Sequence, residues 1–136
     1  QTCALPICLR FTPRVSPSQF RINLQLADVF LDTYPYNCGS TSNDVIAAGI
    51  PLVTCSGTTM VSRMGGSILS ALGMNHLIAN NLDEYQDIVI ALASGTRSAH
   101  VGRVSAEKVK EVCARMVSSL ERGLIARYQQ LKEQQS

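Results

Sequence analysis

The sequence is poor in the residues that bind nucleic acids. Its 136 residues include no tryptophan, three phenylalanines and four tyrosines, and the formal net charge is only +2. A nucleic-acid-binding face needs Lys and Arg concentrated on one side, with aromatic side chains between them. We therefore expect no nucleic-acid partner.

Cysteine and histidine are few and scattered. No C-x-x-C pair occurs, and the two histidines lie far in sequence from the five cysteines, which are Cys3, Cys8, Cys38, Cys55 and Cys113. Zinc sites and disulfide frameworks use regular spacings, and an odd number of cysteines leaves one unpaired. We expect neither kind of site, and we expect a reducing, cytoplasmic compartment.

Long apolar runs are also absent. A membrane-spanning helix needs about 20 apolar residues, and the longest candidate, Val45–Cys55, contains Gly49 and Pro51. The N-terminus lacks the basic start of a signal peptide. Its opening, Gln1–Ile7, resembles translated sequencing-adapter read-through. We expect no membrane contact, treat residues 1–7 as a non-native segment, and expect the natural protein to extend upstream.

The sequence does contain a strand–turn–helix–strand pattern over Asp28–Thr54. Short apolar runs, Val29–Leu31 and Ile50–Val53, flank a polar segment of small residues that leads into a short helical pattern. Gly49 stands where a helix ends in a left-handed residue. Proteins of the α/β class use this unit to hold a phosphate at a helix N-terminus.

Strand and helix patterns alternate along the rest of the chain. Ser16 and Pro17 are the expected N-cap and first residue of a helix that ends near Ala27. Helical periodicity follows over Met60–Leu72. A long amphipathic pattern over 99–130 is expected to break in two, at Gly123 or at Ser118–Ser119. The alternation predicts an α/β fold with a Rossmann-like parallel sheet and C-terminal helices.

Three runs carry a resemblance to a known family. They are ADVFLDTYPYNCGSTSNDVIAAGIPLVT, GTTMVSRMGGSILSALGM and LIANNLDEYQDIVIALA. Together they resemble the C-terminal catalytic lobe of the O-linked N-acetylglucosamine transferase (SPINDLY-type) family, glycosyltransferase family 41, whose fold is GT-B. The resemblance runs from about Leu9 to Gly95. It implies a nucleotide-sugar-binding lobe over residues 8–96, followed by C-terminal amphipathic helices over 97–136.

The resemblance implies a binding site for a UDP-sugar. The positions that match the family's pyrophosphate site are Gly39, Ser40 and Thr41, and Asp44 matches the carboxylate that holds the uridine ribose. Helix N-terminal amides and hydroxyl donors suit that role. The family's catalytic base and its tetratricopeptide repeats lie upstream, so we expect no catalytic residue in this chain. No D-x-D carboxylate pair occurs, which fits the family's metal-independent chemistry.

The sequence departs from the animal enzymes at several site positions. Gly39 stands where they have a histidine, and Pro17, Phe20 and Asn23 stand where they have a lysine, a histidine and an arginine. Phe20 and Asn23 are more similar to the family's bacterial N-glucosyltransferases. The favoured function is transfer of N-acetylglucosamine from UDP-GlcNAc to protein Ser or Thr. The alternatives are N-glucosylation of Asn from UDP-glucose and a non-catalytic binding domain.

Structural roles compete with several of these assignments. The run from Thr41 to Asp44 also fits a capping box with Thr41 as N-cap. Asn37, a possible ligand contact together with Phe20 and Asn23, is equally a turn-forming residue. Arg63 could reach a phosphate or pair with a carboxylate such as Asp32, and we favour the pairing. The expected partners are a UDP-sugar, an acceptor protein, and the missing N-terminal lobe and repeats of the same protein.

Overall fold

The computed structural model describes residues 9–96 and 104–134. Three expectations fall outside these residues or at their limit. They are the non-native segment 1–7, the boundary between 96 and 97, and the helix start at 99. Three short parallel strands form the sheet, in the order β1-β2-β3. The strands are β1 (Phe30–Leu31), β2 (Leu52–Cys55) and β3 (Ile78–Ala79).

The central strand β2 is buried over its whole length. Its partners Phe30 and Leu31 pair with Leu52 and Val53 on one side, and β3 pairs on the other. A strand buried on both faces reads as a continuous apolar run, because neither face meets water. The sequence-based expectation of a parallel α/β sheet is therefore confirmed.

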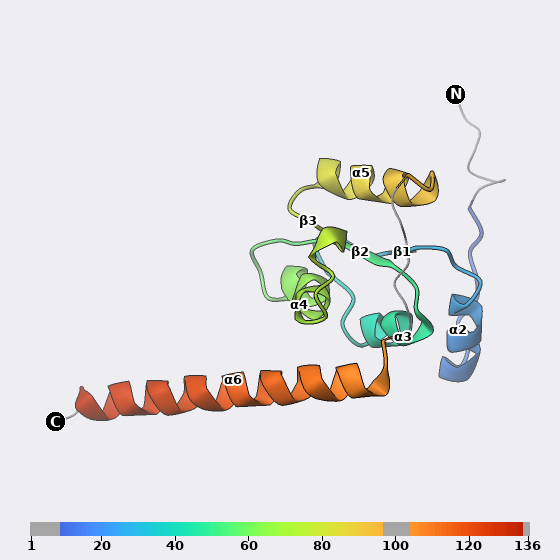
Figure 1. Cartoon of the computed structure of the whole chain (residues 1–136). Helices are drawn as coiled ribbons and strands as arrows, with labels where there is room; N and C mark the ends of the chain where they lie inside the picture. Colours follow the sequence, from blue (N-terminus) through green and yellow to red (C-terminus); the bar gives the residue numbers. More distant parts are fainter. Residues whose placement is uncertain (1–8, 97–103, 135–136) are drawn as a thin grey trace.

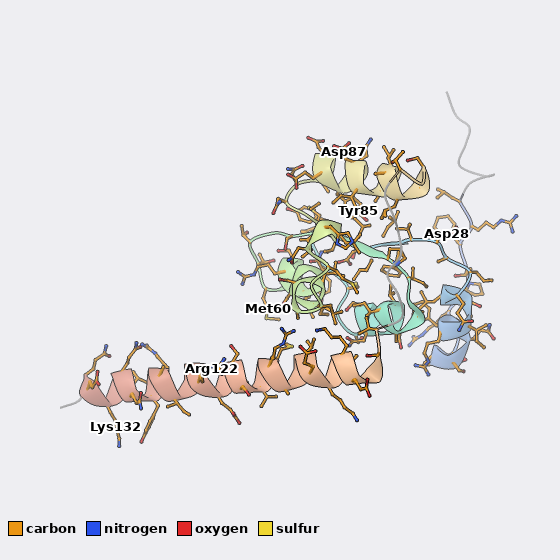
Figure 2. All side chains as sticks on the ribbon, viewed as in Figure 1. Asp28, Met60, Tyr85, Asp87, Arg122 and Lys132 are labelled. Atoms are coloured by element: carbon orange, nitrogen blue, oxygen red, sulfur yellow. The ribbon has the colours of Figure 1, made fainter. Side chains whose placement is uncertain are left out.

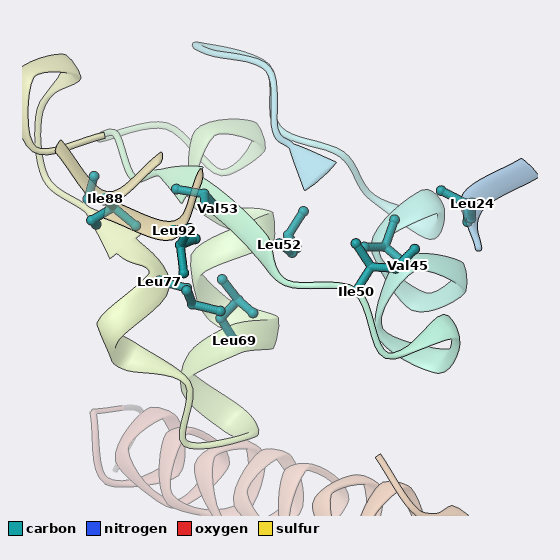
Figure 3. Packing of buried hydrophobic residues seen from close by; sticks show 10 residues of the cluster. Leu24, Val45, Ile50, Leu52, Val53, Leu69, Leu77, Ile88 and Leu92 are labelled. Atoms are coloured by element: carbon teal, nitrogen blue, oxygen red, sulfur yellow. The ribbon is translucent and has the colours of Figure 1, made fainter. Parts of the chain in front are cut away.

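Helices cover both faces of the sheet, with α5 on one face and α3 and α4 on the other (Figure 1). The helices are α2 (Pro17–Leu24), α3 (Ser40–Ala48), α4 (Met64–Ala71), α5 (Leu82–Ala93) and α6 (Ala106–Glu133). Two 3-10 turns, η1 (Val61–Arg63) and η2 (Asn75–Leu77), precede α4 and β3. Figure 3 shows the apolar core that these layers enclose, built around Leu52, Val53, Leu69 and Leu77.

Local signals explain where the helices begin and end. The Ser16 hydroxyl accepts a hydrogen bond from the backbone N–H of Gln19, as an N-cap does, and Pro17 is the first residue of α2. At the end of α3, Gly49 has φ of 79°, the left-handed conformation that favours glycine. Both expectations are confirmed, although α2 ends at Leu24 rather than near Ala27.

Two expected helices differ from the sequence interpretation. The helix expected over Met60–Leu72 begins as the 3-10 turn η1 and becomes α-helical only from Met64. The break expected at Gly123 or at Ser118–Ser119 is wrong, since α6 runs unbroken for 28 residues. A glycine in a solvent-exposed helix costs about 1 kcal/mol against alanine, which is too little to interrupt a helix of this length.

Only the first part of α6 packs against the domain. Val112 is buried, and the Arg115 guanidinium donates a 2.9 Å hydrogen bond to the backbone carbonyl of Ala71. Farther along, the helix extends past α4 into solvent, where Arg122 and Lys132 lie (Figure 2). Its apolar side chains there are exposed: Met116, Leu120, Leu124, Ile125, Tyr128 and Leu131.

Candidate functional site

The N-terminus of α3 lies just beyond the carboxyl end of β1, the edge at which parallel sheets bind ligands. The loop 32–39 joins the two elements, and Gly39 is the N-cap of α3 without any side-chain cap. The Ser42 N–H bonds the Gly39 carbonyl, which leaves the N–H groups of Ser40 and Thr41 without a partner in the described part of the chain. Free donors at a helix start favour an anion.

A cleft of about 720 Å³ opens beside this helix start. The segment before α2, one face of α2 and the first turns of α3 line it: Thr12, Pro13, Arg14, Val15, Pro17, Phe20, Asn23, Leu24, Ala27, Ser40, Thr41 and Asp44. The structure thus brings together five of the expected site residues from two separate helices. Gly39 adjoins the cleft as the N-cap of α3, and Asn37 does not line it.

The charge of the cleft is low and nearly balanced. Its lining carries two charged side chains, Arg14 and Asp44. A third charge comes from α2, because the Arg21 guanidinium lies 3.5 Å from the Asp44 carboxylate. Both side chains are partly exposed, so this ion pair contributes little to folding. Its effect is to neutralise a negative charge at a place where an anionic ligand would bind.

The capping box, the structural alternative for the run from Thr41 to Asp44, does not form. Helix α3 begins at Ser40, one residue before the expected N-cap Thr41, and the Ser42 hydroxyl donates to the Gly39 carbonyl. Thr41 and Asp44 are therefore not engaged in capping and face the cleft. Since the capping alternative does not hold, the Thr41 side chain is available to a ligand, and the Asp44 carboxylate is shared with Arg21.

The end of the Met64 side chain, from α4, reaches the turn at Gly39. A Cβ built on Gly39 would lie 2.9 Å from the terminal methyl of Met64. The space that a larger side chain at this position needs is therefore filled by a thioether.

Asn37 is a structural residue in this arrangement. It is completely buried, and its amide group donates to the carbonyls of Thr33 at 2.9 Å and Cys55 at 3.3 Å. These bonds tie the loop after β1 to the end of β2. The side-chain amide oxygen of Asn37, Oδ1, has no hydrogen-bond partner among the described residues. The geometry favours the turn-forming alternative over a ligand contact.

Asp32 is the most connected polar residue near the site. One carboxylate oxygen accepts from the N–H groups of Thr33 at 2.9 Å and Cys38 at 2.6 Å, and the other from the Thr54 hydroxyl at 2.6 Å. The expected pairing with Arg63 is wrong. Backbone and hydroxyl donors already satisfy the carboxylate, and Arg63 is exposed.

Neither cysteine beside the site behaves as a nucleophile. Burial, and then the nearby Asp32 carboxylate, raise the pKa of the Cys38 thiol to about 12. Burial also raises the pKa of Cys55. Both groups are protonated thiols at neutral pH and therefore unreactive. Cys38, Cys55 and Cys113 are all free thiols.

A second cavity, of about 540 Å³, lies between α3, α4 and the start of α6. Its lining is mostly apolar and includes no charged side chain. An anionic ligand needs fixed donors or cations, so the cleft between α2 and α3 fits a phosphate better. Within residues 9–96 and 104–134, no three His, Cys, Asp or Glu side chains converge as a metal site requires. Nor is any helix of this part long and apolar enough to cross a membrane.

Sequence reasoning missed two parts of the site. The segment before α2 lines the cleft, with Arg14 as its charged residue, yet it forms no regular element and carries no motif. The role of Asp32 was also missed, because opposite charge pointed to Arg63. Its position directly after the strand β1 was the available signal, since polar residues at the carboxyl end of a parallel strand often serve a site.

The chain is similar to known glycosyltransferases. The family model described as glycosyl transferase family 41 matches residues 11–123. The probable UDP-N-acetylglucosamine–peptide N-acetylglucosaminyltransferase SPINDLY of Arabidopsis thaliana is 36% identical over 80 residues, which are 59% of this chain and 9% of that protein. A second protein of the same plant, the probable UDP-N-acetylglucosamine–peptide N-acetylglucosaminyltransferase SEC, is 42% identical over 69 residues. These residues are 50% of this chain and 7% of that protein.

A solved structure is also similar. It is a mutant O-GlcNAc transferase of Thermobaculum terrenum, with a TM-score of 0.57 and 29% sequence identity over 79% of this chain and 19% of that chain. The expected fold class, an α/β lobe of a GT-B enzyme, is thereby confirmed.

Proposed function

The chain belongs to glycosyl transferase family 41, and we propose that it is the UDP-sugar-binding part of a protein glycosyltransferase. In the proposed reaction, N-acetylglucosamine passes from UDP-GlcNAc to a Ser or Thr of an acceptor protein. The names of the SPINDLY and SEC relatives support this donor and this class of acceptor. The single observation that carries the proposal is the cleft in which α2 faces the open N-terminus of α3.

The proposed site holds the leaving group. The N–H groups of Ser40 and Thr41 and their hydroxyls would donate to the diphosphate, and the Asp44 carboxylate would accept from the ribose hydroxyls. As the bond from the sugar to the diphosphate breaks, negative charge grows on the phosphate. Donors that are already fixed in place stabilise that charge without having to reorganise. The low net charge of the cleft means that oriented dipoles supply much of this stabilisation.

The chain is a small part of the proteins that it resembles. It spans 9% of the length of the SPINDLY relative and 19% of the solved O-GlcNAc transferase chain. In our proposal, the segment upstream of this chain carries the catalytic base, the acceptor site and any tetratricopeptide repeats. The proposal includes metal-independent transfer and a cytoplasmic location. The location is supported by the free thiols of Cys38, Cys55 and Cys113, the three cysteines in the described residues.

One observation favours a second donor. Phe20 and Asn23 both line the cleft, in positions that match a histidine and an arginine of the animal enzymes. An aromatic ring and an amide there resemble the family's N-glucosyltransferases, which use UDP-glucose and modify Asn. A competition titration with UDP-GlcNAc and UDP-glucose distinguishes the two donors, because the natural donor should bind the site more tightly.

The experiment is a calorimetric titration of the full-length natural protein with UDP, with and without EDTA. We expect saturable binding that EDTA leaves unchanged. Asp44→Ala should weaken it roughly tenfold or more, since hydrogen bonds to a charged group are worth about 1.5–3 kcal/mol. Asp87→Ala is the matched control, because Asp87 is an exposed carboxylate on α5, away from the cleft (Figure 2). Absence of saturable UDP binding in the full-length protein would exclude the proposed function and leave a non-catalytic domain.

A further inference from the structure

The loop that leads into α3 is organised by one buried carboxylate. The Asp32 side chain is 6% exposed and follows β1 directly. One of its oxygens accepts from two backbone N–H groups at the two ends of the loop, those of Thr33 and Cys38. Hydrogen bonds to an ionised acceptor are shorter and stronger than neutral ones. The 2.6 Å bond from Cys38 fixes the chain one residue before the N-cap Gly39.

Two neighbouring elements hold the carboxylate in turn. The Thr54 hydroxyl of β2 donates to the second oxygen at 2.6 Å. The Tyr85 hydroxyl of α5 donates to the backbone carbonyl of Asp32 at 3.0 Å, and Figure 2 shows this ring between α5 and the sheet. Side chain and backbone of the same residue are thus fixed by a strand and by a helix on the opposite face from α3.

Helix α4 closes the pocket around this carboxylate. A Cβ on Gly65 would lie 2.6 Å from an Asp32 oxygen and 2.7 Å from the Thr54 hydroxyl oxygen. Only a glycine lets the helix approach so closely, which explains the glycine at position 65 of α4. The close approach excludes water, and in a water-poor site a hydrogen bond to a carboxylate is electrostatically stronger.

We propose that Asp32, held by Thr54 and enclosed by Gly65, is the positioning residue for the donor diphosphate. It sets the loop 33–38 and so the direction of the free N–H groups of Ser40 and Thr41. The inference rests on the proposed function, because it concerns the same UDP site. It adds residues that touch no ligand and act through the backbone of the turn.

The two adjacent glycines of α4 provide a matched test. A Cβ on Gly66 would also meet a hydroxyl closely, that of Ser56 at 2.8 Å, but not Asp32. Both Gly65→Ala and Gly66→Ala should lower the melting temperature of the full-length protein. Only Gly65→Ala should raise the Kd for UDP, by about tenfold, while the Kd for uridine changes less than about twofold. Uridine lacks the phosphates, so it reports on the rest of the site.

A second pair of variants decides the question if Gly65→Ala does not fold. Thr54→Val keeps the shape and removes the hydroxyl donor, and Thr54→Ser keeps the donor. We expect Thr54→Val to weaken UDP about tenfold relative to uridine, and Thr54→Ser to restore near wild-type affinity. Equal UDP affinities in Gly65→Ala and Gly66→Ala, or in Thr54→Val and Thr54→Ser, would overturn the positioning role. A wild-type protein that binds no UDP would instead overturn the proposed function itself.

Discussion

Replacing Arg21, which pairs with Asp44, tests the diphosphate and the ribose of the proposed nucleotide ligand separately. Asp44 is expected to accept from the ribose, and Arg21, 3.5 Å away, brings a positive charge to the edge of the same cleft. The variant Arg21→Met removes the charge and keeps most of the length of the side chain. Binding of the diphosphate should weaken, whereas binding of uridine should stay equal or improve because Asp44 is released.

The size of the effect follows from Coulomb's law. For a phosphate ~8 Å from the guanidinium, two unit charges interact by about 0.5 kcal/mol in water and about 2 kcal/mol at an effective dielectric constant of ~20. Arg21 and Asp44 are 55% and 37% exposed, which places the interaction in the lower half of this range. A loss of about 1 kcal/mol corresponds to roughly fivefold weaker UDP binding. The fold itself should lose less than about 1 kcal/mol, as is typical of surface pairs.

The assay is the ratio of the Kd for uridine to the Kd for UDP, measured on the full-length protein. In Arg21→Met the ratio should fall about fivefold at low salt. At about 1 M salt, where the Debye length is ~3 Å, the difference from wild type should nearly vanish. Arg122→Met is the control, since Arg122 is exposed on the far part of α6 (Figure 2). An unchanged ratio, or a change that high salt does not diminish, would refute the electrostatic explanation.

Two further predictions concern the core and the thiols. Leu52→Ala should reduce the free energy of unfolding by about 2–5 kcal/mol in urea denaturation, because Leu52 is completely buried in the central strand; Leu31→Ala, at a half-exposed position, should cost far less, and equal losses would contradict the assigned core. At neutral pH, iodoacetamide should alkylate Cys38 at least about tenfold more slowly than an ordinary exposed thiol, because a pKa raised to about 12 leaves very little thiolate, and the greater nucleophilicity of that thiolate offsets only part of the loss. Peptide mass spectrometry should show the exposed Cys113 labelled first, and comparable rates would mean that Cys38 is less shielded than the structure indicates.

The elements that the sequence predicted best are those with strong local signals. Ser16 and Pro17 begin α2, and Gly49 ends α3 in a left-handed conformation. Each of these residues has a conformational preference that acts within a few bonds. The buried strand β2 was equally clear, since an unbroken apolar run fits a strand covered on both faces.

The errors arose where packing decides between local alternatives. The run from Thr41 to Asp44 fits a capping box, yet the loop held by Asp32 starts the helix one residue earlier. Opposite charges favoured a pair between Arg63 and Asp32, but backbone and hydroxyl donors reach the carboxylate first. The sequence alone does not show which of these donors binds the carboxylate, because their distances from it depend on how α4 packs against the sheet.

The candidate site shows the same division. Ser40, Thr41 and Asp44 were predicted through a resemblance, and the structure places all three along one cleft. Arg14 and Arg21 were not predicted, because one lies in a segment without regular structure and the other on a helix with no clear apolar face. Their relation to the site is a matter of tertiary geometry, and no spacing in the chain encodes it.

A cleft with so little net charge depends on the direction of its donors. Arg14, Arg21 and Asp44 together supply one net positive charge against a diphosphate that carries several negative ones. Oriented N–H groups must therefore contribute much of the affinity, and their contribution falls steeply when they are misaligned. Salt screens the attraction between an exposed charge and the ligand, so the effect of removing that charge shrinks at high salt. The effect of misaligning a fixed donor does not depend on salt in this way. The deficit of Arg21→Met should thus disappear at high salt, and the deficit of Gly65→Ala should persist there.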